Sequence, residues 1–302
     1  LQKMQQLLLK TDAANNVVVK GAGNTTITTV AATTVASIDA SALTGTLTYK
    51  NTGAATTGII GSSTAKNTLN LTSTGVTVTA ITGSANDEVK LSAASAGTLN
   101  VTTGAGDDKV TVNGALIGKA TIDMGAGTND TLVLADVNAL AATLDNSSQV
   151  TLSGVETIIV NQDSTLFNNV LLDGKAYTIK TATGAETITV NAYDKSGVAT
   201  TASTDLSGLT LSTATGSAVA GVTINGLANA VNTIKGTSGK DTITAGTKAD
   251  IIDLSKGGAD VVTIAAGDST WTTTSNNVDK IASFSTSGLA ASADKLDFAG
   301  AA

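Results

Sequence analysis

Three stretches of the chain repeat in register: GSANDEVKL at residues 83–91, GAGDDKVTV at 104–112 and GAGTNDTLVL at 125–134. Each joins a glycine turn to an acidic residue and then to β-branched or leucine residues, and their first glycines, Gly83, Gly104 and Gly125, are evenly spaced. A unit of this size cannot bury its own apolar face and must lie against its neighbours. The repeat therefore predicts the stacked coils of a solenoid, whose function resides in a repeated scaffold.

Most of the chain after Asn15 alternates Thr with Val, Ile or Leu between Gly or Asn turns, as in GTLNVTTG at 97–104. Such period-two alternation is typical of half-buried strands. Each 21-residue unit holds two strands and two turns, so the predicted fold class is all-β, a right-handed parallel β-solenoid or β-roll. Helix is expected only at Leu1–Leu9 and near Val137–Leu144. For residues 24–80 and 192–230, where the period is weak, a sandwich or irregular structure stays open.

The composition excludes the most common kinds of catalytic and metal-binding site. The 302 residues include no Cys and no His, and only 2% are aromatic. Without these residues there are no disulfides, thiolate nucleophiles or imidazole bases, and no ordinary zinc, copper or haem sites. We therefore expect no enzyme activity.

Nearly all of the charged residues are of two types, Asp and Lys. Asp supplies 21 of the 24 acids, all 17 basic residues are Lys, and the net charge is -7. Asp is a short carboxylate that suits hard cations, whereas phosphate and nucleic-acid sites usually need Arg. We expect no nucleic-acid partner. No run of 18 apolar residues is present, so no transmembrane segment is predicted either.

The C-terminal third carries a tighter repeat: GTSGKDTIT at 236–244, AGTKADIID at 245–253, GGADVVTI at 257–264 and AAGD at 265–268. Its aspartates Asp241, Asp250, Asp260 and Asp268 recur at intervals of nine, ten and eight positions. If half a coil takes about nine residues, Asp241 and Asp260 stack on one edge and Asp250 and Asp268 on the other.

Stacked carboxylates beside glycine turns suit Ca²⁺, which takes six to eight oxygen ligands from carboxylates and backbone carbonyls. Like charges repel when no cation is present, so calcium is expected to fold the roll as it binds. The alternatives are that these aspartates only cap tight turns, or that an asparagine ladder replaces some metal sites. The predicted calcium ligands are Asp241, Asp250, Asp253, Asp260, Asp268, Asp87, Asp107, Asp108, Asp130, Asn86, Asn129, Gly104, Gly106, Gly236, Gly239 and Gly257.

Two other patterns invite a function. Glu156 and Glu186 could pair as the two carboxylates of a glycosidase, but both occur in near-identical GxET phrases with no aromatic residue nearby, which favours repeated structure. Thr-x-Thr phrases at 26–28 and 187–189 are compatible with ice binding. They do not recur at one fixed position of the coil, and strands select Thr for its β-propensity alone.

The cassettes resemble the nonapeptide GGxGxDxUx of repeats-in-toxin proteins, most closely in GTSGKDTI and GGADVV. That resemblance implies a calcium-binding parallel β-roll and export by type I secretion. The Thr-, Ala-, Val- and Gly-rich remainder resembles surface-layer proteins of Gram-negative bacteria. This implies an extracellular protein of the cell surface that assembles with copies of itself into a calcium-dependent lattice. Lipopolysaccharide or another surface anchor would be bound through an N-terminal domain outside this sequence.

The expected organisation has five parts: a Thr-rich solenoid start (1–80), calcium-cassette coils (81–135), coils with weak cassettes (136–230), a β-roll (231–268) and a C-terminal cap (269–302) before a missing secretion signal. Two functions of other classes stay open. A calcium-dependent adhesin stalk would use a similar rod and remain monomeric. A secreted lyase or hydrolase would need a cluster of acids on one face, which the sequence does not show.

Overall fold

The computed structural model describes residues 5–9, 15–29, 35–51, 57–72, 77–92, 98–113, 119–135, 150–161, 164–182, 186–194, 197–213, 221–265, 268–271, 276–286 and 293–298. Contacts divide the chain into two compact units. The first comprises Leu1–Thr143 and Ser148–Ile159, and the second comprises Leu144–Ser147 and Val160–Ala302. The finer five-part division stays a prediction.

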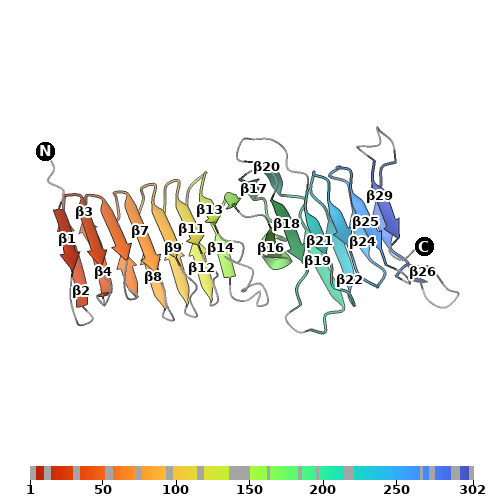
Figure 1. Ribbon diagram of the computed structural model, residues 1–302, viewed down its shortest axis with the longest axis horizontal. Helices are drawn as coiled ribbons and strands as arrows, with labels where there is room; N and C mark the ends of the chain where they lie inside the picture. The colour runs from red at the N-terminus through yellow and green to blue at the C-terminus, as the bar shows by residue number, and fades with distance from the viewer. Residues whose placement is uncertain are drawn as a thin grey trace. The chain divides into compact units, whose positions relative to one another are not determined.

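The first unit is built from parallel strands that alternate between two sheets (Figure 1). One sheet has, in spatial order, β1 (Gln5–Leu9), β3 (Thr25–Thr29), β5 (Leu47–Asn51), β7 (Asn67–Thr72), β9 (Glu88–Ser92), β11 (Lys109–Asn113), β13 (Thr131–Leu134) and β15 (Thr157–Val160). The other has β2 (Asn15–Gly21), β4 (Val35–Leu43), β6 (Gly58–Ile60), β8 (Val78–Ile81), β10 (Leu99–Thr102), β12 (Ala120–Asp123) and β14 (Val150–Ser153). Each coil gives one strand to each sheet, which confirms the predicted parallel β-solenoid.

The strand register reproduces the predicted period. Leu99 of β10 pairs with Val78 and Ala120, and both lie one period of the glycine cassettes away from it along the chain. In the other sheet Lys109 pairs with Glu88 at the same interval and with Thr131 at an interval one position longer. Residues that share a register position stack directly on one another from coil to coil.

The core of the first unit is a set of such stacks. In the odd-numbered sheet the inward side chains of successive strands are almost fully buried, and each stands over the next in register. Burial of one such Val, Ile or Leu side chain contributes about 1.5–3 kcal/mol. This stack consists of Ile27, Tyr49, Leu69, Val89, Val110 and Leu132.

The coils of the second unit vary more in length. One parallel sheet has β16 (Ser164–Asn168), β18 (Thr187–Asn191), β21 (Thr223–Asn225), β23 (Thr242–Thr244), β25 (Val261–Ile264) and β29 (Lys295–Phe298). Another has β19 (Thr201–Asp205), β22 (Val231–Lys235), β24 (Ile251–Asp253) and β28 (Lys280–Ala282). In addition β17 (Thr178–Thr181) pairs with β20 (Thr210–Thr213), and β26 (Thr270–Trp271) pairs antiparallel with β27 (Asn276–Asn277).

In the second unit the register fits the predicted half coil. Thr242 pairs with Thr223 and Val261 at equal intervals along the chain, and Thr233 pairs with Ile251 at an interval one position shorter. Both intervals equal two of the half coils inferred from the aspartate spacing, to within one position. The next pairings, of Ile251 with Lys280 and of Val261 with Lys295, span much longer stretches of chain. Long intervals also separate Thr189 from Thr223 and Thr201 from Val231. The regular short coil therefore extends from β21 to β25, and excursions of the chain interrupt it on both sides.

Two local predictions need correction. The helix expected at Leu1–Leu9 is wrong, because Gln5–Leu9 forms β1 and pairs in parallel with β3, which satisfies its backbone groups through the neighbouring coil. The sandwich alternative is wrong as well, since the described strands within residues 24–80 and 192–230 pair in parallel between coils. The sequence did not predict the one short helix of the described chain, α1 (Asn169–Leu172).

Two further points concern helices and handedness. The helix expected near Val137–Leu144 falls outside the described residues. Within the described chain, no helix has both the length and the apolar character needed to cross a membrane. The right-handed sense of the coil stays a prediction.

A column of glycines lets the turns of the first unit approach one another. Gly104 and Gly125 have φ of +100° and +76°, which only glycine adopts readily. A Cβ on Gly104 would lie 2.1 Å from the carbonyl oxygen of Gly83, and one on Gly125 would lie 1.9 Å from that of Gly104. These carbonyls accept the N–H groups of Ala105 and Ala126, at 2.9 and 2.7 Å. The glycines are therefore required by backbone contact between coils.

We predict that Gly104→Ala destabilises the first unit much more than Gly21→Ala does. Both residues have positive φ, which costs an alanine about 1–2 kcal/mol, but a Cβ on Gly21 has no atom within 4 Å. The clash at Gly104 should add about 1–3 kcal/mol. Urea unfolding of both variants measures the difference. Equal destabilisation would contradict the close approach of the coils.

Candidate metal-binding ladders

The buried acids of the first unit form a hydrogen-bonded ladder along one edge of the solenoid. In each step a carboxylate accepts the backbone N–H of the equivalent residue one coil earlier. The donor–acceptor distances are 2.6 Å from Asn67 to Asp87, 2.7 Å from Asp87 to Asp108 and 2.7 Å from Asp108 to Asp130. The last step joins Asp130 to Glu156 at 2.8 Å. We call this series the first ladder.

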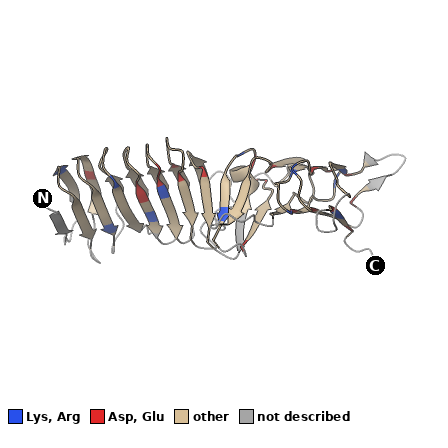
Figure 2. Ribbon diagram, turned by 90° about the horizontal axis from the view of Figure 1, so that it is seen from above, with Lys and Arg blue, Asp and Glu red and all other residues tan. Residues whose placement is uncertain are grey.

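The second unit has two such ladders, one on each edge. In one, Val222 donates to Asp241 at 3.0 Å, Asp241 to Asp260 at 2.8 Å, and Asp260 to Asp294 at 3.0 Å. In the other, Asn232 donates to Asp250 at 2.6 Å and Asp250 to Asp279 at 2.8 Å. We call these the second and third ladders. Figure 2 shows acidic residues, in red, recurring along both units.

In the cassettes, glycine leaves the space that the buried aspartate carboxylate occupies. The ladder carboxylate folds back under its own turn, where a side chain would collide with it. A Cβ on Gly236 would lie 2.6 Å from Oδ2 of Asp241, and one on Gly127 or Gly258 would lie 2.7 Å from a carboxylate oxygen of Asp130 or Asp260. Glycine in the turn therefore makes room for the buried carboxylate.

Two ladders begin with an asparagine in place of the acid. Asn67 donates through Nδ2 to Asp87 at 3.0 Å, and its Oδ1 accepts the N–H of Ser62 at 2.7 Å. Asn232 likewise donates through Nδ2 to Asp250 at 3.0 Å, and its Oδ1 accepts from Leu227 at 2.8 Å. An amide can therefore occupy a ladder position with both ends bonded.

Beside the first ladder runs an exposed outer row that includes three predicted ligands. Asn86 accepts the N–H of Asp107 at 3.0 Å, and Asp107 accepts from Thr128 and Asn129, each at 3.3 Å. Both carboxylate oxygens of Asp107 are thus used. This row is close to the asparagine ladder that the sequence left open as an alternative to metal.

Several ladder carboxylates keep one oxygen without a partner. Asp87 and Asp241 bond their second oxygen to turn N–H groups of Gly83 and Thr237, at 3.1 and 2.6 Å. Other members have a buried oxygen with no hydrogen-bond partner among the described residues. These oxygens are Oδ2 of Asp108, Asp130, Asp250, Asp260 and Asp279.

Burial controls the charge of these groups. It raises the pKa of Asp130 to about 6 and that of Asp260 to about 7, and the neighbouring ladder carboxylates add to both shifts. Burial also raises the pKa of Asp108, Asp241 and Asp250. A bound cation or a proton would therefore stabilise Asp130 and Asp260 near neutral pH.

The donor set suits a hard cation. The unpartnered atoms are carboxylate oxygens, and an unsatisfied buried charged group is costly enough that a partner is expected. Oxygen-only ligands favour Ca²⁺ or Mg²⁺ over transition metals. In the first ladder Asp108 and Asp130 would hold the cation, and in the second Asp260 would do so.

The remaining predicted ligands lie elsewhere. Oδ1 of Asp253 accepts the N–H of Ser255 at 2.9 Å and caps a turn, as the alternative to metal binding suggested. Gly106, with φ +112°, and Gly257, with φ +77°, are turn residues. Gly239 donates to the Thr237 hydroxyl at 3.1 Å. Asp268 is not a ladder member, but it lies near Asp250 and Asp279.

Sequence reasoning missed Asp279 and Asp294, which end two ladders, and the opening residues Asn67 and Asn232. It treated Glu156 as a weak cassette. A usable signal was present, because each of these residues stands two positions before an aliphatic residue, as in DKI at 279–281 and NTI at 232–234. Their turns lack the glycine spacing of the cassettes.

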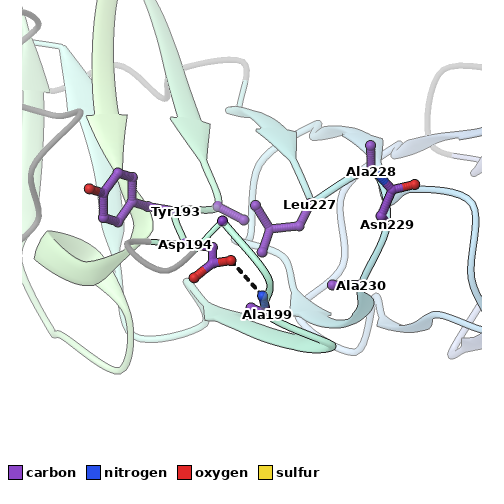
Figure 3. A pocket seen from close by; sticks show the side chains of 9 residues that line it. Tyr193, Asp194, Ala199, Leu227, Ala228, Asn229 and Ala230 are labelled. Carbon is purple, nitrogen blue, oxygen red and sulfur yellow. Dashed lines mark hydrogen bonds between the residues drawn. The ribbon is translucent and has the colours of Figure 1, made fainter.

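A shallow pocket of about 340 Å³ lies in the second unit beside Tyr193 and Leu227 (Figure 3). Asp194 is the one acid among its lining residues, and its carboxylate accepts the N–H of Ala199 at 2.5 Å. The pocket therefore offers no pair of carboxylates. Glu156, one of the two candidate glycosidase acids, is bonded in the first ladder.

No protein-family model matches the chain, and neither the curated proteins nor the solved structures contain a match to it.

We predict that the cation-free protein becomes less stable as the pH rises from 5 to 8. The folded-state pKa values of Asp130 and Asp260, about 6 and about 7, exceed the ordinary 3.8. The folded state binds more protons than the unfolded state does. The stability that these two groups contribute is therefore fully present below their pKa in the unfolded state and is lost as the pH rises through 6–7. The thermal midpoint in chelator measures this dependence. A midpoint that increases over this range would contradict the assignment.

Two substitutions in the second ladder should have opposite effects in chelator at pH 7.5. Asp260→Asn removes a buried charge whose Oδ2 has no partner, and Asn232 shows that an amide fits a ladder position, so the thermal midpoint should rise. Asp241→Asn removes an acceptor from Thr237 or Val222 and should cost about 1–3 kcal/mol. Destabilisation by both variants would show that Asp260 is not an uncompensated charge.

Proposed function

We propose that the chain is a structural protein of a bacterial surface layer, in which calcium stabilises the solenoid and permits lateral assembly into a two-dimensional lattice. The observation that supports this proposal best is the set of buried ladder carboxylates with an unpartnered oxygen. It repeats along the chain, as a structural role requires, and is not confined to one pocket.

The role of calcium follows from the energetics of the ladders. Without a cation the ladder acids must be protonated or repel one another, and either state weakens the stacking of coils. A cation that binds only the folded chain stabilises it by RT ln(1 + [L]/Kd), about 2.7 kcal/mol when calcium is at 100 times its Kd. Folding would then await the higher calcium concentration outside the cell.

The lattice part of the proposal rests on the resemblance to surface-layer proteins and on the repeated surface of the coils. A stack of coils presents each outward position many times, so weak contacts between copies add along its length. Export by type I secretion would deliver the chain unfolded. An extracellular, cell-surface location and a surface anchor such as lipopolysaccharide belong to the same proposal.

We predict that calcium added to chelator-treated protein first increases its β-structure and thermal midpoint and then drives growth into ordered sheets. Circular dichroism follows the first step, and light scattering with negative-stain electron microscopy follows the second. Magnesium at equal concentration is the control. Calcium-dependent folding without growth would instead support the adhesin stalk. A midpoint that responds to neither calcium nor chelator would rule out the calcium-dependent function.

A further inference from the structure

Three acids of the second unit converge at one end of the third ladder. Asp250, Asp268 and Asp279 each offer a carboxylate oxygen, and the three oxygens lie within 4.8 Å of one another. Asp250 and Asp268 are only 0% and 2% exposed, and Asp279 is half-buried. Among the described residues no other group of three acids approaches this closely.

The three carboxylates are held by different parts of the chain. Asp250 follows the turn before β24, and its Oδ1 is fixed by Asn232. Asp279 stands one coil on, directly before β28, and accepts the N–H of Asp250. Asp268 comes from the excursion between β25 and β28, outside the ladder spacing. Its N–H bonds to the carbonyl oxygen of Ala265 at 3.1 Å.

The excursion itself is tied to the site by hydrogen bonds. Nδ2 of Asn277 donates to the carbonyl oxygen of Asp268 at 2.7 Å and to that of Thr247 at 3.2 Å. The N–H of Asp279 donates to the Ser269 hydroxyl at 3.0 Å. These bonds place Asp268 beside the ladder while leaving its carboxylate available.

Each of the three carboxylates has one oxygen without a hydrogen-bond partner among the described residues: Oδ2 of Asp250, Oδ1 of Asp268 and Oδ2 of Asp279. No lysine compensates them, since the two ion pairs of the described chain join Lys109 to Glu88 and Lys235 to Asp205. Three adjacent carboxylates, two of them excluded from solvent, therefore lack a positive partner within the described part of the chain.

We propose that Asp250, Asp268 and Asp279 bind one calcium ion, and that this ion fastens the excursion between β25 and β28 to the coil. The choice of calcium rests on the proposed function. Asp268 is the distinguishing ligand, because a repeat of ladder turns alone would supply only Asp250 and Asp279. The site therefore holds the excursion against the regular coil, and we call Asp250, Asp268 and Asp279 the clasp.

The ligand set favours calcium over magnesium. Magnesium requires near-ideal octahedral geometry and gives up its water reluctantly, whereas three carboxylates from separate parts of the chain supply an irregular set of oxygens. Calcium also accepts irregular coordination completed by water or carbonyl oxygens. A half-buried Asp279 leaves such an approach open.

The test counts bound ions. Isothermal titration calorimetry of the full chain with calcium should show one site fewer in Asp268→Asn than in the wild type. The control is Asp39→Asn, which makes the same charge change at a surface residue that caps Ser41 at 3.0 Å, and it should bind as many ions as the wild type. An unchanged count in Asp268→Asn would overturn the proposal, and circular dichroism confirms that both variants are folded.

A second measurement locates the ion. Terbium can replace calcium at oxygen-ligand sites, and its luminescence on direct excitation reports binding without the aid of an aromatic side chain. We expect at least a tenfold weaker terbium affinity in Asp268→Asn and Asp279→Asn, and none of this loss in Asp39→Asn. Equal affinity in all four proteins would overturn the site.

The thermal midpoint separates this proposal from the proposed function. If calcium raises the midpoint of the wild type and of Asp268→Asn equally, the clasp is wrong while the calcium-dependent scaffold stands. If calcium raises neither, the calcium-dependent function itself fails. A smaller increase in Asp268→Asn than in the wild type supports both.

Discussion

The bond on which the rest of the structure depends runs from the backbone N–H of one coil to the carboxylate of the next. In each ladder it occurs directly before a strand, so it fixes where that strand begins relative to its neighbour. Because strand side chains alternate with a period of two, a slip by a single position would turn the buried Val and Leu of every coil outward. The carboxylate ladders therefore set the register that the apolar stacks require.

The same bond makes the scaffold sensitive to its ionic surroundings. A hydrogen bond to a charged group is strong, but it needs a carboxylate buried away from water, and one donor does not satisfy two oxygens. The chain meets this demand in three ways. Backbone N–H groups satisfy the second oxygen of Asp87, Asp241 and Asp294, and asparagine replaces the acid at Asn67 and Asn232. The members that keep an open oxygen are Asp108, Asp130, Asp250, Asp260 and Asp279. Only the last group calls for a cation or a proton.

The sequence predicted the solenoid and the stacking of Asp241 with Asp260, because both depend on spacing, which is visible in one chain. It was wrong to stack Asp268 on Asp250, since Asp279 takes that ladder position. The period of the first unit and the half coil of the second followed from glycine and aspartate positions alone. It missed Asp279 and Asp294 because long excursions precede them and replace the glycine turn, although the acid keeps its place before the strand. It mistook Gln5–Leu9 for helix because a short apolar run carries no period, and only pairing with β3 decides its conformation.

Coil length explains why the two units should differ in their dependence on a cation. The longer coil of the first unit carries one described ladder, whereas the shorter coil of the second carries two, one at each turn. From β21 to β25 the coil thus places a ladder acid at each of its two turns, where the longer coil of the first unit places one. Since each unpaired buried charge adds an electrostatic cost, this part of the second unit depends more on a cation. The three-acid clasp lies in this unit, where one more buried carboxylate would be hardest to tolerate without a cation.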